Sequence, residues 1–435
     1  MKINGLIWQP NKLSALEVQM LRLTTAIMAA TLTLPAVAGE GGDIALRHLY
    51  AGTAAAGITE LDAPPDAESR FGKGMLQFAN AIEHFGQGLY RHGFAPNWGW
   101  GGVNAPSQML IPVPANPNPE PLDYEKLRAM LVILVTEMDE AQKTLREAGV
   151  AGDYVIPLDV MKVGLDLDGD GGSAPGESIA AILGGAMGLT NRRQSNPAEP
   201  GSLVIGLDRA DAIWLAGYTN IVATQADFLL AHDFHELFYA TFHRLFPGAG
   251  LPLENDIRGR RARGQGYELL DPDSEVTVAD LIALIHTIDW AVVEPDRLKR
   301  VRERLLTISA LSRQNWAAIT AETDNDRELL PNPDQTAAVG RARVNAEQIA
   351  AWQSTLDTFD QVVNGELLIP HWRFAKGFDV KAYFETATNT DLVMLLTGYD
   401  ALPFLKDGPI ATEASFSDLL RAFGGNWPGY AFWFN

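Results

Sequence analysis

The sequence predicts a mainly α, multi-helical globular protein, and three observations support this fold class. The chain has 435 residues, 47% of them hydrophobic, which is enough for a large core. Large apolar residues recur at steps of three and four along several long segments, as on one face of a helix. No convincing series of alternating strands appears. The composition also excludes disordered, collagen-like and coiled-coil chains.

Charge and cysteine content limit the classes of partner and site. The formal net charge is -20, and nucleic acid and anionic lipid are bound by cationic surfaces, so neither is expected as the main partner. Acidic proteins attract cations instead. The chain has no Cys, which excludes disulfides, thiolate metal sites and a cysteine nucleophile.

The N-terminal segment is typical of a secretory signal. Residues 23–34 form an apolar run preceded by Arg22 and followed by an A-x-A triplet at 36–38. The run is too short to span a bilayer, and the alternative is a buried core helix. We expect residues 1–38 to be a signal peptide, cleaved after Ala38, and the chain to be exported to the periplasm or secreted.

Two amphipathic helices are expected early in the remaining chain. Six large apolar residues of the first share one stripe: Phe71, Met75, Phe78, Ile82, Phe85 and Leu89. The second repeats this spacing at Leu127, Leu131, Leu134, Met138, Ala141 and Leu145, and Gly149 follows as a stop signal. Both stripes are expected to cover one core.

Capping signals place further helices. Thr277 with Asp280 resembles a capped helix start, and Pro295 stands where a first-turn proline is favoured. Another helix is expected from about residue 344 to the stop at Asn364 and Gly365.

Two connections are long. Residues 93–121 are rich in proline and contain Trp98 and Trp100, which either fix this loop to the core or stack on a sugar or peptide. Residues 191–202 are polar and are the best candidate boundary. The expected organisation is an N-terminal helical region at 39–200 and a C-terminal helical region at 201–435, unless the two share one continuous core.

Residues 166–177 carry the strongest chemical signal. They match D-x-D-x-D-G-x5-E at every specified position and resemble the EF-hand calcium-binding loop. The resemblance implies a set of oxygen ligands, as Ca²⁺ prefers: single carboxylate oxygens from Asp166, Asp168 and Asp170, the Gly172 carbonyl and both oxygens of Glu177. The alternative is a solvated Asp/Gly turn without metal.

The flanks of this loop differ from a complete EF-hand. Pro157 and Gly164 disfavour a full entering helix, whereas residues 178–183 favour an exiting one. No second complete loop is present, and sensor EF-hands work in pairs. We therefore expect a structural calcium, with a calcium-responsive regulator as an alternative.

A second constellation lies in the apolar segment 211–246, which is expected to form one long helix. On it His232, Glu236, Tyr239 and His243 follow steps of four, three and four and would share a face. Imidazole and carboxylate at this spacing suit zinc or iron, and His84 is a further candidate for such a site. The alternative is that these are hydrogen-bonded core or interface residues.

A third group is the acidic run Glu322, Asp324, Asp326 and Glu328, whose spacing favours a water-facing position over a second cation site. No nucleophile elbow, P-loop, dinucleotide fingerprint or complete H-E-x-x-H motif is present, so an enzymatic activity has no motif to support it.

Three short phrases are similar to a group of uncharacterised exported bacterial proteins: residues 214–218, 371–374 and 433–435. The resemblance implies no particular activity. The sequence favours an exported calcium-binding helical protein with a non-catalytic binding or scaffold role in the cell envelope. Its expected partner is an envelope protein or a small ligand. The alternatives are a metal-dependent envelope enzyme and the calcium-responsive regulator.

Overall fold

The computed structural model shows a mainly α protein, which confirms the predicted fold class. It describes residues 38–95, 99–100, 103–104, 113–181, 202–254, 278–325, 327–338 and 344–423. Several segments with sequence predictions lie outside these ranges: residues 1–37 of the expected signal, Trp98, residues 191–201, Thr277, Asp326 and residues 433–435.

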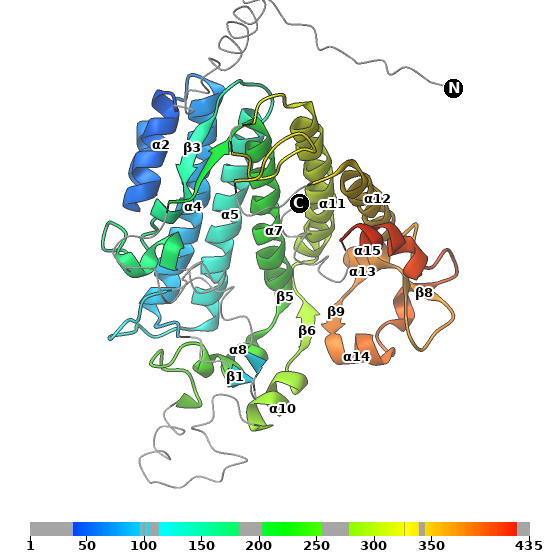
Figure 1. Ribbon diagram of the computed structural model, residues 1–435. Coiled ribbons are helices and arrows are strands. Elements are labelled where there is room, and N and C mark those ends of the chain that lie inside the picture. Colours follow the sequence, from blue (N-terminus) through cyan, green and yellow to red (C-terminus); the bar gives the residue numbers. More distant parts are fainter. Residues whose placement is uncertain are drawn as a thin grey trace, which may run out of the picture. The chain divides into compact units, whose positions relative to one another are not determined.

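Four long helices lie side by side and form the centre of the described structure (Figure 1). They are α4 (Ala67–Arg91), α5 (Tyr124–Ala148), α7 (Arg209–Ala231) and α11 (Pro295–Ala321). Helix α5 packs against α4 and α7, and α7 packs against α11. The two predicted early helices and the first-turn position of Pro295 are confirmed.

Described residues on both sides of residue 200 share one core. The largest buried cluster contains Phe71 and Leu145 from the N-terminal part together with Ile213 and Trp316 from the C-terminal part. Contacts between α5 and α7 therefore join the two regions directly.

Two short helices, α2 (Glu40–Ala51) and α3 (Ala54–Glu60), cover α4. Gly41 allows α2 to lie close to α4, because a Cβ at this position would be 2.6 Å from Ser69 Cα. The Glu68 carboxylate accepts hydrogen bonds from Gly39 and Gly42, so it satisfies free N–H groups at the start of α2.

On the other side, α12 (Ala346–Val363) packs on α11 and is followed by its C-terminal capping residue Asn364, close to the predicted bounds. Gly365 follows with φ of 69°, a left-handed conformation that glycine adopts readily. Beside α12 and α11 lie α13 (Val380–Thr386) and α15 (Ser417–Phe423). The remaining named helices are short: α8 (His235–Thr241), α10 (Val278–His286), α14 (Leu392–Thr397), and the 3₁₀ turns η2 (Val160–Lys162), η3 (Pro175–Glu177), η4 (Phe242–Arg244), η6 (Leu402–Phe404) and η7 (Glu413–Phe416).

The strands of the described residues are short and pair antiparallel. They are β1 (Gly99–Trp100), β2 (Val103–Asn104), β3 (Ile156–Asp159), β4 (Val204–Leu207), β5 (His232–Asp233), β6 (Asp289–Val292), β7 (Ile369–Pro370), β8 (Gly377–Phe378), β9 (Asn389–Asp391) and β10 (Leu405–Lys406). Strand β3 pairs with β4, β5-β6-β9 and β10-β8-β7 form small sheets, and β1 pairs with β2.

The prediction of a single helix over residues 211–246 is wrong. Helix α7 ends at Ala231, His232 is extended with φ of -113° and ψ of 155°, and α8 begins only at His235. Arg128 on α5 donates hydrogen bonds to the carbonyls of Leu230 and His232, at 2.8 and 2.9 Å. These bonds satisfy carbonyls that a continuing helix would use, and β5 pairs with β6 at the same point.

Among the described helices, none has an apolar stretch long enough to cross a bilayer.

Candidate functional site

The acidic loop 166–177 is closed at its base by backbone pairing. The N–H of Leu165 donates to the Glu177 carbonyl at 3.2 Å, and that of Ile179 donates to the Val163 carbonyl at 2.9 Å. Strand β3 and the turn η2 precede the loop, so no α-helix enters it, as Pro157 and Gly164 indicated. Residues 179–181 are helical, and the rest of the expected exiting helix lies outside the described residues.

The loop brings together three of its predicted ligand residues. Oxygens of Asp166, Asp168 and Glu177 all lie within 4.8 Å of one another. Asp166 is 9% exposed and Glu177 only 1%. Two of the three convergent side chains are therefore largely removed from water, and Asp168 is half-buried.

Backbone N–H groups of the loop orient these carboxylates. Asp166 accepts from Gly169 at 2.7 Å and from Gly171 at 3.2 Å. Glu177 uses both of its oxygens as acceptors, for Leu167 and Asp168 with Oε1 and for Ala174 with Oε2, at 3.0, 3.1 and 2.8 Å. The chain thus wraps around its own acidic side chains.

The remaining predicted ligand residues lie on the outer part of the loop. Asp168 Oδ1 accepts from the N–H of Asp170, and Asp170 Oδ1 accepts from that of Gly172, at 3.0 and 3.2 Å. Each hydrogen bond uses one carboxylate oxygen. Gly171, the glycine specified by the motif, has φ of 101°, a region in which L side chains are strained.

No basic side chain balances this charge among the described residues. Lys162, the nearest basic residue in the sequence, forms its ion pair with Asp159 instead, at 3.4 Å. Buried carboxylates are normally paired with a cation or bound to a metal, because the ionised form loses hydration on burial. A bound cation would supply the missing charge.

Helix α4 supports the loop through two side chains that the sequence analysis did not select. Glu83 accepts from the N–H of Asp166 at 3.2 Å, and Gln87 donates to the carbonyl of Asp166 at 2.9 Å. Burial raises the pKa of Glu83 to about 7, and the charges of Asp166 and Glu177 act in the same direction. The signal in the sequence is only the four-residue spacing of Glu83 and Gln87 beside the apolar stripe.

The His232, Glu236 and His243 set is not brought together. His232 is fully buried, with Nδ1 2.6 Å from the Phe228 carbonyl and Nε2 2.7 Å from Thr390 Oγ1. Glu236 is exposed on α8, and none of the three belongs to a convergent ligand group of the described residues. Burial lowers the pKa of His232, which favours a neutral, structural imidazole.

Other histidines contact different parts of the molecule. His243 is 6% exposed, and neither of its ring nitrogens has a hydrogen-bond partner. Its Nε2 lies 4.0 Å from Asp280, which also pairs with Arg244 at 2.7 Å. Burial, followed by the charge of Arg244, lowers the pKa of His243. His84 lies at the surface, 2.6 Å from Glu137 of α5.

The prediction that the acidic run at 322–328 faces water is wrong for part of the run. Oxygens of Asp208, Glu322 and Glu328 lie within 4.8 Å of one another and form a second acidic group. Glu328 is 6% exposed and does not face water, whereas Glu322 is half-buried. Asp324 is exposed, as expected. The run looked solvated because its spacing does not reveal Asp208, which β3–β4 pairing and α7 bring to this point.

Ionising all the carboxyl groups of this second group at once would be energetically unfavourable. Burial raises the pKa of Glu322 to about 8, and the charge of Asp208 adds to this. The pKa of Asp208 and that of buried Asp211 are raised as well, mainly by burial. The arrangement can share protons between its carboxyl groups or accept a cation.

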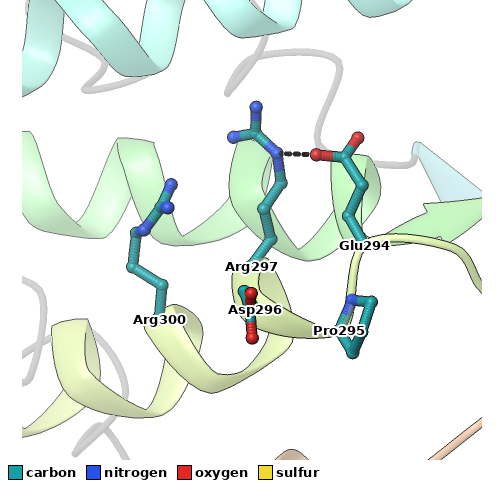
Figure 2. A pocket seen from close by; sticks show the side chains of 5 residues that line it. All are labelled: Glu294, Pro295, Asp296, Arg297 and Arg300. Carbon is teal, nitrogen blue, oxygen red and sulfur yellow. Dashed lines mark hydrogen bonds and ion pairs between the residues drawn. The ribbon is translucent and has the colours of Figure 1, made fainter.

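The first turn of α11 lines a pocket beside an ion-pair network, and Figure 2 shows its five residues: Glu294, Pro295, Asp296, Arg297 and Arg300. Arg297 donates to Glu294 at 2.6 Å, as drawn, and also to Asp227 at 2.6 Å. Asp227 is fully buried and also bonded to Arg304 at 2.8 Å. The arginines are thus engaged in balancing a buried carboxylate between α7 and α11.

No family model, curated protein or solved structure matches this chain.

Proposed function

We propose that this chain is an exported calcium-binding helical protein whose loop 166–177 holds a structural calcium. The observation that carries the proposal is the convergence of Asp166, Asp168 and Glu177 without a basic partner among the described residues. Four carboxylates, with Asp170, give a hard cation the anionic oxygens that it prefers.

The residues present fit Ca²⁺ in number and type. Asp166, Asp168 and Asp170 would each offer a carboxylate oxygen, Gly172 its carbonyl, and Glu177 both of its oxygens, with water completing the set. Calcium bound there would offset part of the negative charge of the loop and join its two ends. The left-handed conformation of Gly171 supports the sharp turn that this ligand arrangement requires.

The export part of the proposal rests on residues 1–38, with cleavage after Ala38, and places the protein in the periplasm or outside the cell. Extracellular calcium-binding modules are weak, with dissociation constants of roughly 10⁻⁴ to 10⁻³ M, and ambient calcium is sufficient to fill them. We further propose a non-catalytic binding or scaffold role toward an envelope protein or small ligand. Expression of the full chain followed by mass determination of the exported form tests the cleavage site.

Thermal melting tests the calcium proposal. We expect EDTA to lower the Tm and calcium to restore it, because a ligand bound only by the folded state stabilises it. Asp168→Asn should abolish this calcium dependence. The control is Asp153→Asn, an exposed carboxylate outside the loop, which should leave it intact. An equal Tm in EDTA and calcium for the wild type would contradict the proposal.

The alternative of a zinc or iron enzyme gains no support from the described residues. Both ring nitrogens of His232 already have hydrogen-bond partners within the fold, and Glu236 is exposed on a separate helix. The calcium-responsive alternative is supported by one group of contacts around the end of α2.

A further inference from the structure

We infer that the calcium loop and the C-terminal end of α2 are energetically coupled: calcium in the loop stabilises the docked end of α2, and docked α2 strengthens calcium binding. The inference rests on the proposed calcium site. It adds a regulated element, residues 48–52, to what would otherwise be an isolated loop.

Three consecutive residues at the end of α2 accept hydrogen bonds from the loop and the segment before it. The Leu49 carbonyl accepts from the N–H of Gly164 at 2.9 Å, and the Ala51 carbonyl accepts from Ser173 at 3.1 Å. Between them, the Tyr50 hydroxyl accepts from the N–H of Asp159 at 2.8 Å. The loop and the segment before it therefore satisfy carbonyls that a helix leaves free at its C-terminus.

One peptide unit connects the two partners. The N–H of Ser173 and the carbonyl of Gly172 belong to the same planar trans peptide, so they point in opposite directions. The Ser173 N–H is bonded to Ala51, which directs the Gly172 carbonyl away from α2. That carbonyl is the backbone ligand proposed for calcium. A cation that attracts it would also polarise the N–H and strengthen the bond to α2.

Electrostatics act in the same direction. The C-terminal end of a helix carries a partial negative charge, equivalent to roughly half an elementary charge. At the end of α2 this charge lies beside a loop with four carboxylates, so the two repel each other unless a cation is bound. Calcium would reduce this repulsion.

Glycines allow the contact to be this close. Gly52 follows α2 with φ of 65°, and a Cβ on it would lie 2.8 Å from both the backbone nitrogen and the Cβ of Ser173. Gly172 itself lies near Ala51, since its Cβ would be 3.6 Å from the Ala51 carbonyl oxygen. A side chain at Gly52 should therefore separate the end of α2 from the loop without altering any proposed ligand.

The two ends of α2 should respond differently. Glu68 holds the first turn through Gly39 and Gly42, independently of the loop. Without calcium we expect the last turn of α2 to open while its first turn stays docked. Hydrogen exchange resolves this difference, because it reports local opening segment by segment.

The experiment measures calcium affinity by titration with CaCl₂, and hydrogen exchange with and without CaCl₂, on the chain from residue 39 onward. In the wild type, calcium should slow exchange at residues 48–52 and at Ser173 by about tenfold, a typical coupling between linked sites. Exchange in α12 should not change. Gly52→Ala should weaken calcium binding by a similar factor, because coupling is reciprocal.

The control variant is Gly250→Ala. Gly250 has φ of 77°, so alanine imposes comparable backbone strain there, but its Cβ would meet nothing within 4 Å. Its calcium affinity should equal that of the wild type. If Gly52→Ala fails to fold, Tyr50→Phe removes only the acceptor for Asp159 and should weaken binding two- to threefold, a smaller effect than a typical coupling.

The outcomes separate the inference from the proposal on which it depends. If the wild type binds no calcium, the proposed site is wrong and the coupling is wrong with it. If calcium binds and Asp168→Asn abolishes binding, the site stands. Unchanged exchange at residues 48–52, together with wild-type affinity in Gly52→Ala, would then overturn the coupling alone.

Discussion

At the scale of single residues, the described part of the molecule gathers acidic side chains in two places with different consequences. In the loop, Asp166 and Glu177 are oriented by backbone N–H groups around a common point. In the second group, burial and the charge of Asp208 raise the pKa of Glu322. Burial also raises the pKa of Asp208, whereas the hydrogen bond with Glu322 acts to lower it, so the pair is adapted to sharing a proton. Position in the chain distinguishes them: one group lies within twelve residues, the other is assembled across more than a hundred.

Gly171, one of two glycines of the loop with positive φ, provides the first prediction. Gly171→Ala should lower the free energy of unfolding in calcium by roughly 1–2 kcal/mol, because an L residue at φ of 101° is strained. Gly176→Ala is the matched control: its Cβ also meets nothing within 4 Å, and its φ is not left-handed. Denaturant unfolding of both variants checks this, and equal losses would contradict the assignment of the turn to Gly171.

Glu322 provides a prediction of pH dependence. Burial holds the pKa of this carboxyl at about 8 in the folded state, whereas the unfolded chain ionises near 4.5. The folded state therefore keeps a proton that the unfolded state loses, and stability decreases as pH rises from about 4.5 to about 8.

Glu322→Gln should remove this penalty, since the amide stays neutral. We expect the Tm to rise by a few degrees relative to the wild type at pH 8 and to differ little at pH 5. The exposed Glu303 supplies the control, Glu303→Gln, which should show no such pH-dependent gain. A Tm difference that is the same at both pH values would refute the protonated state of Glu322.

At the scale of elements, the positions of the long helices can be predicted from the spacing of apolar residues, whereas the breaks between helices cannot. The stripe from Phe71 to Leu89 and the stop at Asn364 are local signals, and both are confirmed. The end of α7 at Ala231 depends on Arg128 and on strand β6, which are distant in the sequence. The apolar residues around His232 continue the helical period, so no local feature reveals the break.

The same limit applies to the candidate sites. The twelve-residue loop is predictable because all of its ligand-type residues fall within twelve consecutive positions of the chain. The support from Glu83 and Gln87, and the approach of Asp208 to Glu322, arise from helix packing. The His232 stripe was overinterpreted because its geometry assumed an unbroken helix.

The packing of α11 on α7 yields a matched pair of substitutions. Arg304 is buried and bonded to fully buried Asp227 and to Asp139. Arg304→Met leaves Asp227 with less compensation and should cost about 3–5 kcal/mol. Arg313 on the same helix pairs with exposed Asp357 and with half-buried Asp360, both accessible to water, so Arg313→Met should cost clearly less, about 1 kcal/mol. Chemical denaturation of both variants tests the contrast, and similar losses would contradict it.

At the scale of the whole molecule, stability rests on a shared helical core and on internal charge compensation. The chain has no Cys, so disulfides contribute nothing even if it is exported. The core joins the regions on both sides of residue 200, and the network around Asp227 connects α7 to α11. In this setting a calcium in loop 166–177 would add a local constraint beside α2 and α4.

This arrangement accounts for part of the net charge of -20. Some of the excess acid lies in the loop around Asp166 and Glu177, where the described residues provide no basic partner. A protein that carries such a loop is expected to depend on divalent cations for the order of its N-terminal part.

The most direct measurement is calorimetric titration of the purified chain from residue 39 onward with CaCl₂, beside the Asp168→Asn variant. We predict one calcium bound per chain to the wild type and no binding to the variant. Absence of calcium binding to the wild type, or equal binding to Asp168→Asn, would contradict the central claim that loop 166–177 is a calcium site.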